Sequence, residues 1–183
     1  HLVVTSEFSK ASLHYLHGVP NDHMSVLPLP VDLDLFRPSP LDIRTHSLNI
    51  CWLGRIVPRK RFDLFLEAAL MAIQKGVNLH ITVLGDEKLI PGYRQMIAAF
   101  PHQSRLTWIR EPIPRKEVPF LLAYQDVVIQ PSEDEDLGSG PLEAQACGLP
   151  IIVGPKSGNA DYLSQRDVRL PNYQAAYLYS AID

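Results

Sequence analysis

Apolar residues along the chain occur in two alternating patterns, short continuous runs and longer stretches with helical spacing. The short runs are typical of buried strands and cover residues 2–5, 24–27, 48–53, 79–84, 105–109, 126–130 and 150–153. Helical spacing covers residues 7–17, 62–75, 93–100, 116–123 and 142–147. Because alternating strands and helices build βα units, we predict an α/β fold: a Rossmann-like parallel sheet with helices on both faces.

A proline-rich segment at residues 28–40 interrupts this alternation. It contains four prolines together with several charged residues, which favours an extended linker. We therefore predict that residues 1–40 are an inter-domain entry segment and linker, and that residues 41–183 form a Rossmann-like domain. The chain begins with His1 and its last helical pattern is cut at Asp183, so we expect a piece of a longer protein.

Composition limits the classes of protein that fit. Hydrophobic residues make up 46% and charged residues 20%, as in folded globular domains. The net charge of −3 provides no general attraction to nucleic acid, so no nucleic-acid partner is expected. No apolar run approaches the roughly 20 residues of a membrane span, so no transmembrane segment is expected. Cys51 and Cys147 lie among apolar residues, which predicts buried free thiols and a reducing, cytoplasmic setting.

The stretch 131–150 combines an acidic run, a glycine-rich turn and the start of a helix, directly after the strand at 126–130. Glu135 and Glu143 lie eight positions apart across the turn. In parallel sheets ligands bind at the carboxyl ends of the strands, and the free amides of a helix start attract phosphate or other anionic oxygen. Here these amides belong to Gly138, Ser139 and Gly140.

A basic loop follows the strand at 48–53. Its four cations, Arg55, Arg59, Lys60 and Arg61, lie within seven residues. Arg55 would hold two phosphate oxygens with its planar guanidinium, and Lys60 would place a compact charge over a negative leaving group. A solvated basic loop is the alternative. The diphosphate interpretation is favoured because two loops of opposite charge would face one crevice.

Both glutamates have alternative roles. With Pro141 as the first helical residue, Glu143 would be the third, where it would either cap the helix or accept hydrogen bonds from both hydroxyls of a ribose. Glu135 would either keep an acidic loop solvated or accept hydrogen bonds from sugar hydroxyls. Together with Asp134 and Asp136 it also offers oxygen ligands suited to Mg²⁺ or Mn²⁺, although Asp-x-Asp is a common sequence. Two carboxylates would also suit a glycoside hydrolase, which would leave the basic loop unexplained.

Three stretches together resemble the C-terminal, donor-binding half of a family 4 retaining glycosyltransferase of GT-B fold. Residues 4–6, 26–32 and 36–38 resemble the inter-domain entry of that family. Gly54 and Arg55 with Lys60 resemble its phosphate-binding loop, and residues 131–150 resemble its Glu-x7-Glu motif. The chain departs from the family pattern at three places. They are Leu29-Pro30, where the family usually has Asn-Gly, Arg61, where it usually has glycine, and Leu137, where it often has phenylalanine.

The resemblance implies a role for each matching residue. Arg55 and Lys60 would bind the diphosphate of the donor and stabilise the departing nucleoside diphosphate in place of a metal, and Glu135 would hold the donor sugar. Glu143 would hold the ribose, and Arg110 and Leu142 would lie near the base. The full set of implied donor contacts is Gly54, Arg110, Leu137, Gly138, Ser139, Leu142 and Glu143. No metal and no other cofactor is expected.

The implied reaction is hexose transfer from a nucleotide-diphosphate sugar to an acceptor, with retention of configuration, in glycan biosynthesis. An acceptor glycan, lipid or small molecule would bind a missing N-terminal domain. Residues 41–183 would then be the C-terminal nucleotide-sugar-binding domain, and the fragment alone would be inactive. A cytoplasmic location is expected, with peripheral contact to the inner membrane face through the missing domain as a variant. A nucleotide-sugar epimerase of GT-B-like fold and a non-catalytic, donor-like interaction module are the alternatives.

Overall fold

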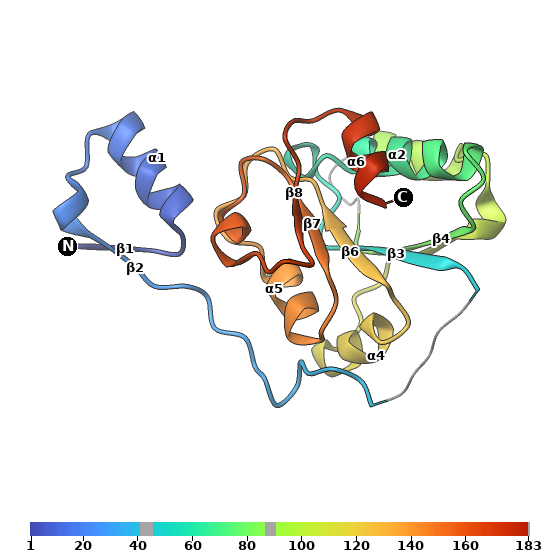
Figure 1. The fold of residues 1–183 in the computed structure, drawn as a ribbon, viewed down its shortest axis with the longest axis horizontal. Coiled ribbons are helices and arrows are strands. Elements are labelled where there is room, and N and C mark those ends of the chain that lie inside the picture. The colour runs from blue at the N-terminus through green and yellow to red at the C-terminus, as the bar shows by residue number, and fades with distance from the viewer. Residues whose placement is uncertain (41–45, 87–90, 183) are drawn as a thin grey trace.

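The computed structural model describes residues 1–40, 46–86 and 91–182. Within these residues the strands form two sheets (Figure 1). The smaller sheet pairs β1 (Leu2–Val4) with β2 (Met24–Val26) in parallel. The larger sheet has six strands in the order β5-β4-β3-β6-β7-β8, and every pairing in it is parallel.

The elements lie close to their predicted positions. The strands of the larger sheet are β3 (Leu48–Leu53), β4 (Leu79–Leu84), β5 (Leu106–Ile109), β6 (Val127–Gln130), β7 (Ile151–Val153) and β8 (Val168–Arg169). The α-helices are α1 (Glu7–His17), α2 (Phe62–Gln74), α3 (Pro91–Ala98), α4 (Val118–Leu122), α5 (Ser139–Ala146) and α6 (Ala175–Ile182). The prediction omitted β8 and began α5 three residues too late. None of the described helices is both long and apolar enough to cross a membrane.

Helices cover both faces of the larger sheet, as predicted. Figure 1 shows α2 and α6 on one side of the sheet and α4 and α5 on the other. Alternate residues of a strand point to opposite faces, so β3 contributes to both cores. Ile50 and Trp52 join the core under α2, whereas Cys51 and Leu53 join the core that contains Ala144 of α5. Continuous apolar strands are therefore expected of this sheet.

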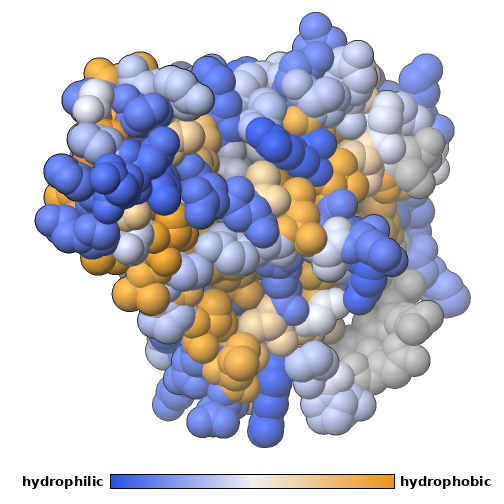
Figure 2. All heavy atoms as spheres, turned by 60° about the vertical axis from the view of Figure 1, so that its left-hand side comes forward, coloured by the Kyte–Doolittle hydropathy of each residue, from blue (hydrophilic) through white to orange (hydrophobic). Residues whose placement is uncertain are grey.

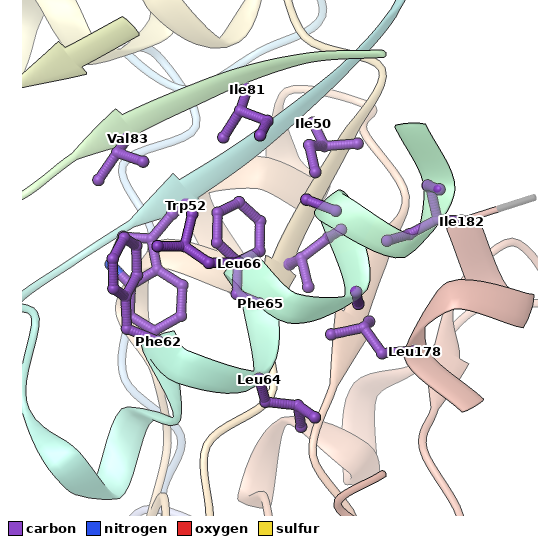
Figure 3. Packing of buried hydrophobic residues seen from close by; sticks show 14 of the residues in the cluster. Ile50, Trp52, Phe62, Leu64, Phe65, Leu66, Ile81, Val83, Leu178 and Ile182 are labelled. Carbon is purple, nitrogen blue, oxygen red and sulfur yellow. The ribbon is translucent and has the colours of Figure 1, made fainter. Parts of the chain in front are cut away.

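Three aromatic side chains pack against one another within the largely aliphatic core under α2 (Figure 3). The ring centroid of Trp52 lies 4.9 Å from that of Phe62 and 5.5 Å from that of Phe65, and all three side chains are fully buried. The two phenylalanines lie in the first turn of α2, directly after the basic loop. This packing therefore fixes where the loop that follows β3 meets its helix.

The core on the opposite face includes a residue of the proline-rich segment. Phe36 is fully buried there, beside residues of β3, α4 and α5. A local turn positions it, because the Asp32 carboxylate accepts hydrogen bonds from the amides of Asp34 and Leu35, each at 3.1 Å. The predicted linker thus forms no helix or strand within residues 28–40, yet it supplies a core side chain.

Both cysteines are free thiols, which confirms the prediction that they form no disulfide. Cys51 is buried in the core with Phe36, and burial raises the pKa of its thiol to about 12. Cys147, directly after α5, is only partly buried, so the prediction of burial is wrong for this thiol. A thiol with such a raised pKa stays protonated at neutral pH and is a weak nucleophile.

The N-terminal helix is attached to the loops that follow β6 and β7. The Ser6 side chain caps α1 by accepting a hydrogen bond from the amide of Ser9. Both serine hydroxyls donate to the carboxylate of Asp136, and the amide of Glu7 donates to the carboxylate of Asp161 at 2.9 Å. Negative charge at a helix N-terminus is favourable, so these contacts stabilise α1 in this position.

The small sheet leaves apolar side chains exposed. Leu2 and Val3 of β1, and Leu27 directly after β2, are between 47% and 66% exposed. Figure 2, which brings the α1 side of the molecule forward, shows apolar surface among hydrophilic residues on this face. A two-stranded sheet alone is marginally stable in water, so its attachment through α1 contributes to its order.

Candidate functional site

The strand order of the larger sheet reverses between β3 and β6. From β3 the chain continues outward to β4 and β5, and from β6 it continues outward in the other direction to β7 and β8. In parallel α/β sheets, ligands bind outside the carboxyl ends of the strands at such a reversal. The loops there are residues 54–61 after β3, the basic loop, and residues 131–138 after β6, the glycine loop.

Ion pairs join the basic loop to the glycine loop. Lys60 forms an ion pair with one carboxylate oxygen of Glu135, and a guanidinium nitrogen of Arg59 lies 3.3 Å from the same oxygen. Lys60 and Glu135 are each only 7% exposed. Burial lowers the pKa of Lys60 because desolvation outweighs the opposing effect of Glu135. Buried, paired charges of this kind cluster at functional sites, so the contact marks the candidate site.

Backbone contacts hold the two loops in register. The amide of Glu133 donates to the carbonyl of Arg59 at 2.6 Å, and the Arg59 guanidinium donates to the carbonyl of Asp134 at 2.9 Å. Arg59 therefore holds the glycine loop through both its backbone carbonyl and its guanidinium. Sequence reasoning assigned this residue only to the general positive charge of its loop.

Arg61 adopts a left-handed backbone conformation, with φ of 57°. Glycine tolerates this region without cost, whereas other residues do not. The departure from the glycine of the family pattern therefore has a conformational cost. Hydrogen bonds from the Arg61 guanidinium to Asp63, at 3.1 to 3.2 Å, and a cation–π contact with Tyr173 at 5.6 Å offset it.

Asn159 holds the backbone of the glycine loop. Its side-chain oxygen accepts a hydrogen bond from the Gly138 amide at 2.8 Å, and its side-chain nitrogen donates to the Gly138 carbonyl at 2.9 Å. Asn159 is fully buried. The expectation that the Gly138 amide would be free for an anion is therefore wrong, since this amide donates its hydrogen bond to Asn159. The amides of Ser139 and Gly140 form the first turn of α5, where amides have no partner within the helix.

Glu143 occupies a different helical position from the one predicted. Because α5 begins at Ser139, Pro141 is the third helical residue and Glu143 the fifth, so the capping-box alternative for Glu143 is wrong. Its side chain is 12% exposed and lies 2.7 Å from a guanidinium nitrogen of Arg115. Burial raises the pKa of Glu143, and Arg115 opposes that effect.

Arg115 was not predicted as a site residue. It lies among Pro114, Lys116 and Glu117, a charged segment that resembles any solvated turn. Its contact with Glu143 joins residues 28 positions apart and depends on how α4 and α5 pack. No local sequence signal marks such a contact.

A cavity of about 240 Å³ opens at the carboxyl ends of β3 and β4 and beside the loop after β5. Three of the predicted residues, Gly54, Arg55 and Arg110, line it together. The Arg110 guanidinium also lies 5.0 Å from the ring centroid of Trp108, which orients it by a cation–π contact. Leu84 and Val118 contribute apolar side chains to the wall of this cavity.

The remaining predicted residues lie along the start of α5. Leu137 is buried, Ser139 is exposed and Leu142 is half-buried. The described lining of the 240 Å³ cavity includes none of these three. The structure thus brings the predicted residues together in three groups, at the cavity, at the Lys60–Glu135 ion pair and along α5.

Gln130 also supports the site and was not predicted. It is 4% exposed at the end of β6, and its side-chain nitrogen donates to the Leu53 carbonyl at 3.1 Å. A side-chain carbon added at Gly138 would lie 2.6 Å from the Gln130 side-chain oxygen. Only glycine therefore allows the loop to approach the end of the strand so closely.

The alternative metal site at residues 134–136 does not match the observed arrangement. The Glu135 carboxylate pairs with Lys60, and the Asp136 carboxylate accepts hydrogen bonds from Ser6 and Ser9. The two carboxylates are thus held by different partners. No group of three His, Cys, Asp or Glu side chains within the described part of the chain is arranged to hold a metal ion.

Replacing Gly85 by alanine should destabilise the protein by about 1–3 kcal/mol, the usual range for overpacking. A methyl group there would lie 2.0 Å from the Gly54 carbonyl oxygen, so the backbone beside the cavity must shift. Urea unfolding measures the loss. Gly92→Ala is the matched control, because the space around Gly92 in α3 is open. Equal stability of the two variants would contradict the prediction.

Comparison with known proteins places the chain in a family. The family model described as "Glycosyl transferases group 1" matches residues 38–182. A D-inositol 3-phosphate glycosyltransferase of Paenarthrobacter aurescens is 32% identical over 153 residues, which cover 76% of this chain and 36% of that protein. The enzyme of the same name from Mycolicibacterium smegmatis is 28% identical and covers 86% of this chain and 38% of its own length. The chain therefore spans well under half the length of these curated relatives.

Solved structures show the same fold. A glycosyltransferase from Rickettsia africae superposes with a TM-score of 0.83 at 20% identity, over 99% of this chain and 52% of that one. HepE from Anabaena, in complex with UDP-glucose, superposes with a TM-score of 0.82 at 17% identity, over 98% of this chain and 52% of that one. These likenesses confirm the predicted fold, one half of a GT-B glycosyltransferase. The chain belongs to the group 1 glycosyl transferases.

Proposed function

We propose that this domain binds a nucleotide-diphosphate sugar and supports transfer of its hexose to an acceptor with retention of configuration, as a family 4 hexosyltransferase. The contact of the basic loop with the glycine loop at the strand reversal carries this proposal, since it pairs Lys60 with Glu135 close enough to Arg55 for the Arg55 charge to act on Lys60. The complex of HepE with UDP-glucose supports a nucleotide sugar as the ligand class. The transferase relatives support group transfer over the epimerase and interaction-module alternatives.

The two cations act on the leaving group in this proposal. Negative charge grows on the diphosphate as the glycosidic bond breaks, so cations fixed before the reaction stabilise the transition state more than the ground state. Arg55 is exposed at the cavity, and Lys60 is held by Glu135. The diphosphate would share Lys60 with Glu135, whose carboxylate would accept hydrogen bonds from the hydroxyls of the sugar. No metal and no other cofactor is needed for this role.

The nucleotide would extend from the diphosphate toward the 240 Å³ cavity. The base would lie against the apolar wall near Arg110, and Glu143 would hold the ribose. Ser139 and Gly140 would offer the amides of the first turn of α5 to anionic oxygen. Leu137, Gly138 and Leu142 would shape the sugar and ribose end of the site.

Binding of nucleoside diphosphates tests this proposal. Ligand-observed NMR of the 183-residue chain with UDP, GDP and ADP should show saturable binding of at least one of them. Arg55→Ala should weaken that binding by about 10–100-fold, the effect of one hydrogen bond to a charged group. Lys75→Ala is the control, because Lys75 ends α2 at the opposite edge of the sheet. A repeat with a chelator should leave affinity unchanged; no saturable binding of any diphosphate would overturn the proposal.

We further expect the fragment alone to turn over little or no donor. The acceptor, a glycan, lipid or small molecule, would bind a further N-terminal domain, in keeping with the partial coverage of the relatives. That domain would also provide any peripheral contact with the inner face of the membrane, in an otherwise cytoplasmic protein. Transfer of radiolabelled sugar from the diphosphate that binds is the measurement. Stoichiometric transfer by the 183-residue chain would contradict this expectation.

A further inference from the structure

One cation at the predicted ribose end of the site has no role in the function proposed so far. Arg115 opens a short 3-10 helix, Arg115–Glu117, that leads into α4. Its guanidinium lies 2.7 Å from Oε1 of Glu143. The carboxylate is nearly buried, whereas the Arg115 side chain is 61% exposed. The pair therefore lies at the boundary between the protein interior and the surface.

A second contact fixes the guanidinium. Its central carbon lies 5.3 Å from the ring centroid of Phe36, which is itself fully buried. Arg115 is thus held between an aromatic ring of the segment 28–40 and a carboxylate of α5. A cation–π contact of this kind favours one orientation of a long side chain.

In this arrangement the two carboxylate oxygens of Glu143 have different surroundings. Oε1 accepts the hydrogen bond from Arg115. Within the described part of the chain, Oε2 has no hydrogen-bond donor. A ribose that binds Glu143 while Arg115 stays in place would therefore donate its hydroxyl hydrogen to Oε2. The guanidinium holds the carboxylate in one orientation and opposes the effect of burial on its pKa.

We propose that Arg115 is the positioning residue of the ribose subsite, holding Glu143 by one oxygen so that the other accepts a hydrogen bond from the ribose. This inference rests on the proposed function, in which Glu143 binds the ribose. It adds a residue that the family resemblance did not imply. It also gives the segment 28–40 a part in nucleotide binding through Phe36.

The charges around Glu143 set the expected dependence on pH. Arg115 faces the carboxylate from the 3-10 helix before α4, and the thiol of Cys147, directly after α5, is the other titratable group that interacts with it in the described residues. Burial raises the pKa of Glu143 and Arg115 lowers it. Removal of Arg115 should raise this pKa further. The ionised form of Glu143 accepts the ribose hydrogen bond. As the pH is lowered, a variant without Arg115 should therefore lose affinity for the nucleotide at a higher pH than the wild type does.

The experiment compares the wild type with Arg115→Ala and Arg115→Lys. Affinity is measured by calorimetry for UDP and 2′-deoxy-UDP, or for the corresponding guanosine or adenosine pair if one of those diphosphates binds better. The wild type should prefer the ribose form by about 10-fold or more, the effect of one hydrogen bond to a charged group. Arg115→Ala should reduce this preference to about twofold or less, leaving only the weak discrimination of an unfixed carboxylate. Arg115→Lys should restore part of the preference.

A neighbouring cation provides the matched control. Lys116→Ala removes an exposed charge from the same short helix and should leave both the preference and its pH profile unchanged. Thermal melting of each variant checks that it is folded. If the wild type binds no nucleoside diphosphate, the proposed function fails. If the wild type shows the preference and Arg115→Ala keeps it, or binds the ribose form more tightly, the inference about Arg115 is overturned while the proposed function stands.

Discussion

Replacing Lys60 by methionine is expected to weaken nucleoside diphosphate binding by about 10–100-fold, because the proposed charge-assisted contact with the phosphate would be lost. The same change should lower the free energy of unfolding by about 3 kcal/mol, the lower end of the range for breaking a buried ion pair. The lower end applies because Arg59 stays 3.3 Å from the carboxylate that Lys60 leaves. Calorimetry measures the binding and urea unfolding measures the stability.

A second variant separates the two effects of Lys60. In Lys60→Met with Glu135→Gln, the buried carboxylate loses its charge along with its partner. Most of the lost stability should return, since the remaining amide costs less to bury than an unpaired charge. Binding should stay weak, because the cation is still absent. Recovery of binding in the double variant would show that Lys60 acts through Glu135 alone and does not contact phosphate.

Replacing Phe36 by alanine is expected to lower the free energy of unfolding by about 3–5 kcal/mol, the usual cost of removing a buried aromatic ring. Phe36 is fully buried between the sheet and the helices α4 and α5. Its segment was predicted as a linker, where a substitution of this kind would have little effect. Urea unfolding of the variant is the measurement.

Leu33 is the matched control for Phe36. It lies three residues earlier in the same turn and is 67% exposed, so Leu33→Ala should change stability by less than about 0.5 kcal/mol. Similar losses in the two variants would mean that the segment contributes as a whole and not through one buried ring. No loss in either variant would contradict the packing described here.

The strands of the larger sheet were predictable because they are buried on both faces. A strand such as β3, apolar at nearly every position, has few other places in a folded protein. β8 was missed because Val168–Arg169 is too short to form an apolar run. Its position depends on pairing with β7 rather than on its own sequence. The start of α5 was missed because Pro141 suggested a first helical turn, whereas the helix begins two residues before it.

The site was predictable as far as the sheet topology determines it. Arg55, Lys60 and Glu135 lie in loops that follow β3 and β6, and parallel strands bring such loops to one edge of the sheet. Asn159 and Arg115 were not predictable in the same way. Each acts through a contact with a residue more than 20 positions away, Gly138 for Asn159 and Glu143 for Arg115. Their effect depends on packing that the local pattern does not specify.

Arg61 shows how a departure from a family pattern can be accommodated. Where the family usually has glycine, this chain has Arg61 in a left-handed conformation, with interactions to Asp63 and Tyr173. The side chain thus offsets a backbone cost that glycine would not have.

The hydrogen bonds that hold α1 determine where the protein can be cut. The family match begins at residue 38, which would suggest an expression boundary there. A cut at that point would remove Ser6, Ser9 and Glu7, the donors to Asp136 and Asp161, and it would also remove the ring of Phe36. Asp136 follows Glu135 directly, so loss of α1 would remove two hydrogen bonds to the residue next to the Lys60–Glu135 ion pair. The N-terminal segment thus supports the glycine loop, and a fragment that begins at residue 38 would lack that support.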